Sequence, residues 1–158
     1  MRAYEQVFVS GPRCIFADVI PVLLALAFLS PPPPAWIQRA NVAPTSAIVT
    51  FRLADVLGTP VVEGITVDRD KIDGTMNVSV IDSRFDPPRV VRQRSLKGQQ
   101  LRWLLAGKRD GLYRNDIAVD LEDKGKETAY LLRVGRGFQL QLVRTVRGRS
   151  LSPRTFSR

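Results

Sequence analysis

Hydrophobic and polar residues alternate with a period of two along most of the chain from Ser46 onward. This period predicts β-strands, and no long stretch shows the period of about 3.6 that is typical of a helix. Turn-forming residues such as Asp73-Gly74 separate the strands, so the sequence predicts about seven to eight short strands, the pattern of a β-sandwich or small barrel. The predicted strands lie in the ranges 47–53, 61–67, 75–81, 89–95, 101–105, 113–121, 130–134 and 138–142.

Two segments of this region carry a weaker pattern. Residues 99–106 (QQLRWLLA) fit a strand, and they also fit a helix of two turns. Residues 147–158 are polar, basic and rich in serine, so we expect a basic tail after a sandwich domain that covers residues 46–146.

The N-terminal part is different, because residues 19–29 (VIPVLLALAFL) form an uncharged and largely hydrophobic run. A run of this length fits the core of a signal peptide, about 7–15 residues, better than a bilayer-spanning helix of about 20. We therefore expect residues 1–30 to be an N-terminal apolar helix that acts as a signal peptide or a membrane anchor. Arg2 and Arg13 precede the run, which favours a cytoplasmic N-terminus and an extracytoplasmic domain, periplasmic or on the cell surface. The alternative is a buried core helix of a cytosolic protein.

A proline-rich segment follows, and we expect residues 31–45 to be a spacer. Four consecutive prolines, residues 31–34, favour an extended left-handed helix that holds a domain away from a surface. Trp36 follows them directly. It has two possible roles, as an amphipathic residue at a membrane interface or as an ordinary core residue.

The composition excludes several kinds of catalytic and metal site. The 158 residues include no histidine and one cysteine. This excludes Ser-His-Asp and Cys-His catalysis, metal sites that use histidine, an internal disulfide and a thiolate cluster. We therefore expect a protein that is not an enzyme, with no metal and no cofactor.

Positive charge is concentrated in the second half of the chain. Residues 1–87 contain 7 Lys and Arg and 9 Asp and Glu, whereas residues 88–158 contain 17 and 6, so that −2 and +11 give the net charge of +9. Arginine outnumbers lysine 19 to 5, which favours fixed, bidentate contacts with carboxylates or phosphates. A coding bias toward GC-rich codons would produce the same excess without a functional demand.

Two short patterns carry a family resemblance. Residues 51–62 (FRLADVLGTPVV) resemble the opening of bacterial immunoglobulin-like modules, in which a strand runs into an Asp-x-x-Gly-x-Pro-Val turn. Residues 110–113 (DGLY) are similar to the Asp-Gly-x-Tyr that starts a late strand in those modules. The resemblance implies an immunoglobulin-like β-sandwich of antiparallel strands. It implies no catalytic residues, since such modules mostly bind, space or assemble, and a fold by itself assigns no function.

The arginines are the main candidates for function. One set lies on two strands that we expect to be neighbours, and a second set lies near the C-terminus. Such a surface suits an acidic protein, an anionic membrane surface or a phosphate polymer. The candidate partner-binding residues are Arg89, Arg92, Arg94, Lys97, Arg102, Arg133, Arg136, Arg144, Arg147 and Arg149.

The acidic residues are weaker candidates for a functional site than the arginines. Residues 68–74 (DRDKIDG) suggest a calcium loop, but the spacing departs from an EF-hand, and Arg69 and Lys71 oppose a cation, so a solvated turn is the preferred interpretation. Asp116 and Asp120 are expected on one strand face. Two carboxylates there can act as acid and base only where burial separates their pKa values, and the local sequence offers no such burial. We expect them to pair with arginines or to face water.

The leading hypothesis is an exported or membrane-tethered binding or assembly module, an accessory or structural subunit. Its arginine-rich C-terminal half would dock an acidic protein partner, a membrane complex, or an anionic lipid or envelope polymer. The alternative is a basic β protein that binds polyanions or nucleic acid, although the aromatic residues that stack on bases are scarce among the cations. Trp103 and Tyr113 have the parity of core residues. A third hypothesis is a hydrolase or lyase that uses carboxylates.

Overall fold

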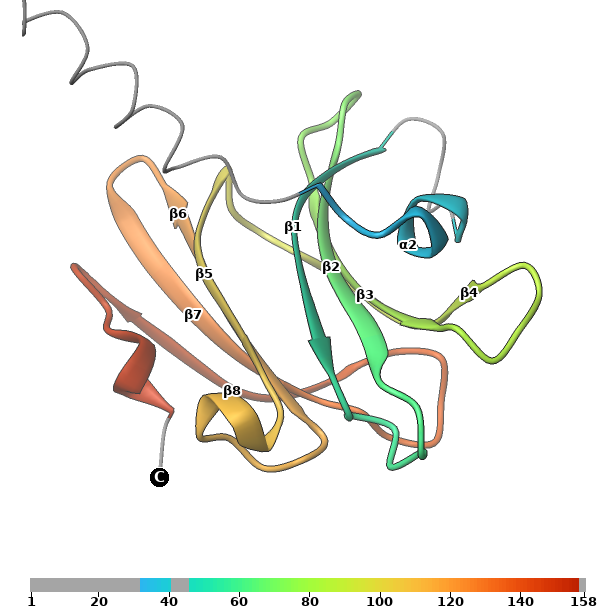
Figure 1. The fold of residues 1–158 in the computed structure, drawn as a ribbon. Coiled ribbons are helices and arrows are strands. Elements are labelled where there is room, and N and C mark those ends of the chain that lie inside the picture. Colours follow the sequence, from blue (N-terminus) through green and yellow to red (C-terminus); the bar gives the residue numbers. More distant parts are fainter. Residues whose placement is uncertain (1–31, 41–45, 157–158) are drawn as a thin grey trace, which may run out of the picture. The chain divides into compact units, whose positions relative to one another are not determined.

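The structure is a computed structural model that describes residues 32–40 and 46–156. In the described residues, eight strands form two four-stranded antiparallel sheets (Figure 1). Sheet A contains β1 (Ser46–Ala54), β2 (Glu63–Asp70), β3 (Met76–Asp82) and β4 (Arg89–Leu96). Sheet B contains β5 (Gln100–Ala106), β6 (Asp116–Asp123), β7 (Lys126–Arg133) and β8 (Gln141–Gly148). The short helices are α2 (Ala35–Arg39) and the 3-10 helices η1 (Lys108–Asp110) and η2 (Pro153–Thr155).

The prediction of a mainly β fold with two antiparallel sheets is confirmed. The ambiguous range 99–106 forms a strand, β5, which pairs along its length with β6. Each sheet takes four consecutive strands, in the orders β1-β2-β3-β4 and β5-β6-β7-β8. In an immunoglobulin sandwich the sheets are ABED and CFG, so the chain changes sheet more often. The strand order therefore supports a two-sheet fold and does not itself support the immunoglobulin type.

The two sheets bury one hydrophobic core between them. Val67 and Val78 of sheet A and Val119 of sheet B are completely buried, and all three belong to the same cluster of contacting side chains. β-Branched residues suit this position because they pack well on a pleated surface. The core explains why the alternating pattern predicted strands such as β3 and β6, in which alternate hydrophobic residues face the opposite sheet.

The sheets also meet at two of their edges. Gln93 of β4 exchanges backbone hydrogen bonds of 3.0 and 3.1 Å with residues 138 and 140, which precede β8. At another edge, Arg52 Nε of β1 donates to the carbonyl of Leu104 in β5, at 3.2 Å. β4 and β5 therefore lie in different sheets, and the prediction that they are neighbouring strands, with one set of arginines across them, is wrong.

Helix α2 lies on the outer face of sheet A, inside the range predicted as a spacer. Ile37 is fully buried and contacts Ile81 of β3, and the partly buried Trp36 packs against the same cluster. The described part of the predicted spacer, residues 32–40, is thus folded against the sheet. Trp36 takes the packing role, one of its two predicted roles.

Gly64 in β2 makes this close approach possible. A Cβ atom at position 64 would lie 2.9 Å from the ring of Trp36 and 3.0 Å from Ile37. These distances are shorter than van der Waals contact, so a side chain at this position forces Trp36 and Ile37 of α2 to shift.

We expect Gly64→Ala to lower the free energy of unfolding by about 1 kcal/mol, because the helix must shift to admit the methyl group. Urea unfolding followed by tryptophan fluorescence measures the change. Gly137→Ala is the matched control, since a Cβ there meets nothing within 4 Å. Equal effects of the two substitutions would contradict the proposed contact.

The predicted signal peptide or anchor, residues 1–30, lies outside the described residues. Among the helices that the structure does describe, none has the length and hydrophobicity needed to cross a bilayer.

Candidate functional site

Several of the predicted partner-binding arginines stabilise the fold. Arg92 Nε donates to the carbonyl of Gly135 at 3.1 Å, and Arg94 Nη1 donates to the carbonyl of Leu140 at 2.8 Å. Both bonds link β4 to the segment that precedes β8. The guanidinium groups of Arg92 and Arg94 therefore join the two sheets.

Other predicted arginines bind carboxylates of the chain itself or an aromatic ring. Arg133 forms a two-point contact with Asp116, with Nε to Oδ1 at 2.7 Å and Nη2 to Oδ2 at 2.9 Å. Arg102 of β5 lies 3.6 Å from Glu122 of β6 and 3.7 Å from a carboxylate oxygen of Glu127 in β7. The guanidinium carbon of Arg89 lies 3.5 Å from the centre of the Phe85 ring.

The remaining predicted cations are exposed, and none of their side chains has an ion pair or hydrogen bond to another described residue. They are Lys97, Arg136, Arg144, Arg147 and Arg149. Arg144 and Arg147 lie on β8, and Arg149 follows it directly. Three of these five cations therefore lie on or directly after β8, at one edge of sheet B.

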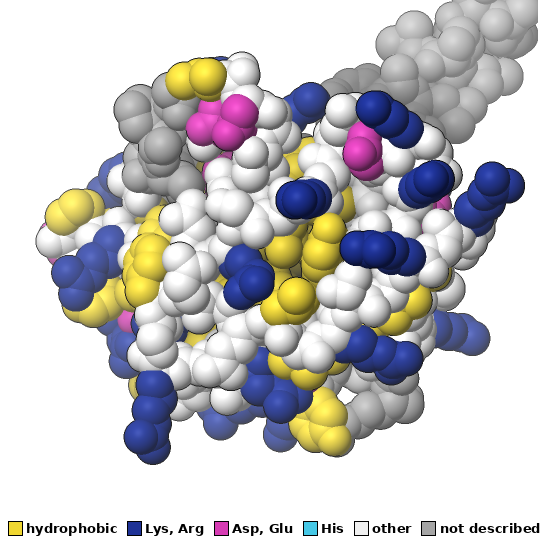
Figure 2. Space-filling view, turned by 180° about the vertical axis from the view of Figure 1, so that it is seen from behind, with side chains coloured by type: hydrophobic (Ala, Val, Ile, Leu, Met, Phe, Trp, Pro, Cys, Tyr) yellow, Lys and Arg dark blue, Asp and Glu magenta, His cyan; other side chains and the backbone are white. Residues whose placement is uncertain are grey.

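Strand β8 is an edge strand, and hydrophobic residues are exposed along it. Leu142 and Val143 are 44% and 45% exposed, and Phe138 just before the strand is 54% exposed. In the part of the chain that the structure describes, β8 pairs with β7 on one side and with no strand on the other. An unpaired edge offers free backbone donors and acceptors to another chain. Figure 2 shows a whole face on which Lys and Arg surround exposed hydrophobic side chains, with few Asp or Glu.

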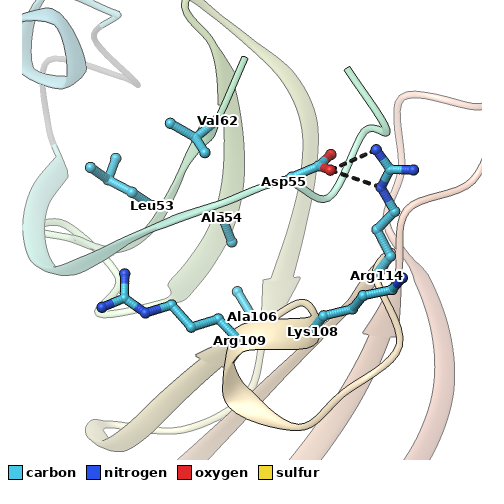
Figure 3. A pocket seen from close by; sticks show the side chains of 8 residues that line it. All are labelled: Leu53, Ala54, Asp55, Val62, Ala106, Lys108, Arg109 and Arg114. Carbon is cyan, nitrogen blue, oxygen red and sulfur yellow. Dashed lines mark hydrogen bonds and ion pairs between the residues drawn. The ribbon is translucent and has the colours of Figure 1, made fainter. Parts of the chain in front are cut away.

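A pocket of about 470 Å³ lies between β1 and the loop that contains η1 (Figure 3). Its walls carry three basic side chains and one acidic side chain, and the rest are aliphatic. The lining residues are Leu53, Ala54, Asp55, Val62, Ala106, Lys108, Arg109 and Arg114. The three cations are close together in the sequence, but their pairing with the aliphatic side chains of β1 and the turn after it forms only when β1 and β5 meet, so the local sequence did not predict this pocket.

Asp55 and Arg114 form an ion pair at one end of this pocket. Arg114 donates from Nε and Nη2 to Oδ2 of Asp55, at 2.9 and 2.6 Å. The hydrogen bond with Arg114 lowers the pKa of Asp55 below its ordinary value, although partial burial opposes the shift. Asp55 also accepts a hydrogen bond from the amide of Gly58, which fixes the turn after β1.

Asp116 and Asp120 lie on one face of β6, as predicted. Their partners in the neighbouring strand β7 are Arg133 and Ala129, and all four lie on the outer face of sheet B. Asp116 is paired with Arg133, which agrees with the expected pairing with arginine. Asp120 differs: it is completely buried, and neither carboxylate oxygen has a hydrogen-bond partner.

Burial raises the pKa of Asp120 to about 6, and the charge of nearby Glu127 adds to the shift. The expectation that Asp120 pairs with an arginine or faces water is therefore wrong. A buried polar atom without a partner is uncommon in folded proteins and is costly when charged.

The C-terminal segment, residues 149–156, folds back toward the outer face of sheet B, the face on which Asp120 lies. The amide of Leu151 donates to Glu127 Oε2, and the indole N–H of Trp103 donates to the carbonyl of Leu151 at 3.2 Å. The prediction of a basic tail from residue 147 is therefore wrong in two respects: β8 continues to Gly148, and the rest contains η2. Trp103 lies opposite Asp120, on the outer face, and Tyr113 is 57% exposed, so their parity does not place either residue in the main core.

The acidic loop that suggested calcium is a turn between β2 and β3. Asp70 and Asp73 accept hydrogen bonds from the amides of Ile72 and Thr75, at 2.7 and 2.8 Å. Asp68 is buried in β2, where burial raises its pKa and bonds with Asn77 and Ser79 partly oppose the shift. Across residues 32–40 and 46–156, no group of three or more His, Cys, Asp or Glu side chains has an arrangement suited to a metal ion.

Comparison of the chain with protein-family models, with curated protein sequences and with solved structures gives no significant match.

Proposed function

We propose that this chain is a non-enzymatic binding or assembly module that docks an acidic partner along the edge strand β8. The observation that carries the proposal is the position of Arg144, Arg147 and Arg149, which are exposed, free of internal partners and aligned with an unpaired strand edge. Arginine at such an edge attracts carboxylates and fixes them through two-point contacts.

The mode of binding that fits this edge is strand addition. An extended acidic segment of the partner pairs its backbone with β8, and its side chains meet an arginine on each face of the strand, because Arg144 and Arg147 lie opposite Leu131 and Thr128 of β7 and therefore on opposite faces. Backbone hydrogen bonds provide affinity in this mode, and the side chains provide specificity.

The proposed module has a particular scaffold and a particular location in the cell. The scaffold is a sandwich of the immunoglobulin-like type, supported by the two-sheet fold and by the turn pattern of residues 51–62. The location is extracytoplasmic, supported by the hydrophobic run at residues 19–29. The mass of the mature protein from its native host tests the location, because it shows whether the first residues are removed.

We expect the double variant Arg144→Glu, Arg147→Glu to bind an acidic strand peptide at least about tenfold more weakly than the wild type, since each change replaces an attraction by a repulsion. The probe is a synthetic peptide of repeated Glu-Glu-Val-Val, which presents Glu on both faces of a strand, and titration calorimetry at two salt concentrations measures the dissociation constant.

The variant Lys124→Glu, Lys126→Glu is the matched control, because it makes the same change of charge in the turn between β6 and β7. A peptide of the same length and charge, in which proline replaces each Val, tests the backbone pairing. If the two double variants weaken binding equally, or the proline peptide binds as well, recognition follows net charge alone. That outcome favours the alternative of a polyanion-binding protein.

A further inference from the structure

A pocket separate from β8 lies between β1 and η1. The pocket has a volume of about 470 Å³, which is within the range of about 300–1,000 Å³ that is usual for small-molecule sites. The loop that forms one wall is held firmly. Asp110 accepts a hydrogen bond from the amide of Ala106 at 2.8 Å, and Gly107, with φ +66°, packs close to the backbone of Asp55.

The pocket has a net positive charge. Arg114 is neutralised by its ion pair with Asp55, whereas the side chains of Lys108 and Arg109 have no ion pair or hydrogen bond to another described residue. In Figure 3, Arg109 extends from η1 toward Leu53, and the Asp55–Arg114 pair lies at the opposite end. Arg109 is therefore free to pair with an anionic group that enters the pocket.

The same pocket has a hydrophobic wall that the fold leaves open. Leu53 and Val62 are 39% and 50% exposed, whereas Ala54 and Ala106 beside them are buried. Covering exposed aliphatic surface contributes about 25 cal/mol per Å², so a hydrocarbon group gains binding energy here. The wall lies next to the free guanidinium group.

We propose that this pocket binds a small amphipathic carboxylate, an aliphatic acid whose carboxylate pairs with Arg109 and whose hydrocarbon chain lies against Leu53 and Val62. A guanidinium group holds a carboxylate through two parallel hydrogen bonds, and Lys108 adds attraction over a longer range. The two ends of the ligand match the two kinds of wall. This inference does not depend on the proposed strand addition at β8.

Titration calorimetry of the full chain with octanoate, octanol and acetate tests the match. Octanoate is expected to bind at least about tenfold more tightly than either octanol or acetate, because each of these lacks one of the two recognised groups. Arg109→Gln and Leu53→Asn are each expected to weaken octanoate binding at least about fivefold, whereas Lys124→Gln, at a distant turn, leaves it unchanged. Arg109, Leu53 and Lys124 are all exposed, so these variants are expected to fold, which a thermal unfolding curve checks.

Three results would overturn the inference. The first is no octanoate binding by the wild type. The second is equal binding of octanol, which would leave only a hydrophobic groove. The third is equal binding of acetate, which would leave only a basic surface. The β8 variant Arg144→Glu, Arg147→Glu is expected to bind octanoate normally, so failure of one proposal is distinguishable from failure of the other.

Discussion

Asp120→Asn is expected to raise the free energy of unfolding by about 2 kcal/mol at pH 8 and to change it little at pH 4. The Asp120 carboxyl is completely buried without a hydrogen-bond partner, and burial, followed by repulsion from Glu127, raises its pKa to about 6. At pH 8 the wild type therefore holds a buried negative charge that an amide of the same shape does not have. At pH 4 the carboxyl is protonated, and the two proteins are nearly equivalent.

Proton linkage gives the direction in which the free energy of unfolding changes with pH. The folded protein binds the Asp120 proton more tightly than the unfolded chain, for which the ordinary pKa is 3.8. The stability from this proton is complete below pH 3.8 and is lost as the pH rises through about 6. Asp68 has a raised pKa and adds to the same trend, whereas the lowered pKa values of Asp55 and Asp82 cost stability as the solution becomes more acidic. The difference in the free energy of unfolding between the wild type and Asp120→Asn at each pH isolates the contribution of Asp120.

Urea unfolding at intervals from pH 4 to pH 8 measures this difference. Asp123→Asn removes an exposed carboxylate from the same strand and is the control. Parallel stability curves for the wild type and Asp120→Asn would show that the carboxyl is hydrated, contrary to its burial in the fold.

We expect the ionisation of Asp120 to destabilise the C-terminal segment, residues 149–156, in particular. Glu127 holds the amide of Leu151, and the Leu151 carbonyl accepts the indole N–H of Trp103. Release of the segment would let water reach the ionised Asp120, so we expect the segment to open before the rest of the fold as the pH rises. Fluorescence of Trp103 in a Trp36→Phe background reports this opening, and Asp120→Asn should remove its pH dependence.

The strands were predictable because each pattern is local. The alternation in a range such as 75–81 places Met76, Val78 and Val80 on one face, and these three side chains belong to the core between the sheets. The division into sheets was not predictable in the same way. The short connection after Leu96 can make a hairpin or pass to a second sheet, and which one forms depends on the partners of β5, more distant in the sequence.

The candidate site was likewise predictable only where it depends on local sequence. The exposed arginines of β8 were predictable as a basic surface, because no carboxylate lies near them in the sequence. The internal roles of Arg92 and Arg94 depend on carbonyl groups more than forty residues away, at Gly135 and Leu140. The local sequence of Asp120 likewise does not show that its side chain is buried on the outer face of sheet B. Long-range contacts decide whether a charged residue serves the fold or remains free, and a local pattern does not contain them.

Glu63→Ala is expected to lower the free energy of unfolding by about 3 kcal/mol. Glu63 is 1% exposed and holds the turn between β1 and β2: Oε2 accepts from the amides of Val56 and Leu57 at 2.9 and 3.2 Å, and Oε1 accepts from the hydroxyl of Thr59 at 2.6 Å. Alanine leaves these donors unsatisfied, and Val56 is fully buried, so water does not replace the lost acceptor there.

Glu63→Gln is the matched comparison, because it keeps the shape and one acceptor oxygen, and we expect it to cost about 1 kcal/mol. Urea unfolding measures both changes, and equal losses would show that the hydrogen bonds to the turn contribute little. The turn also carries Asp55 and Val62, which line the pocket. Glu63→Ala should therefore weaken octanoate binding even where the protein remains folded, whereas Glu63→Gln should largely preserve it, which links the turn after β1 to the geometry of the pocket.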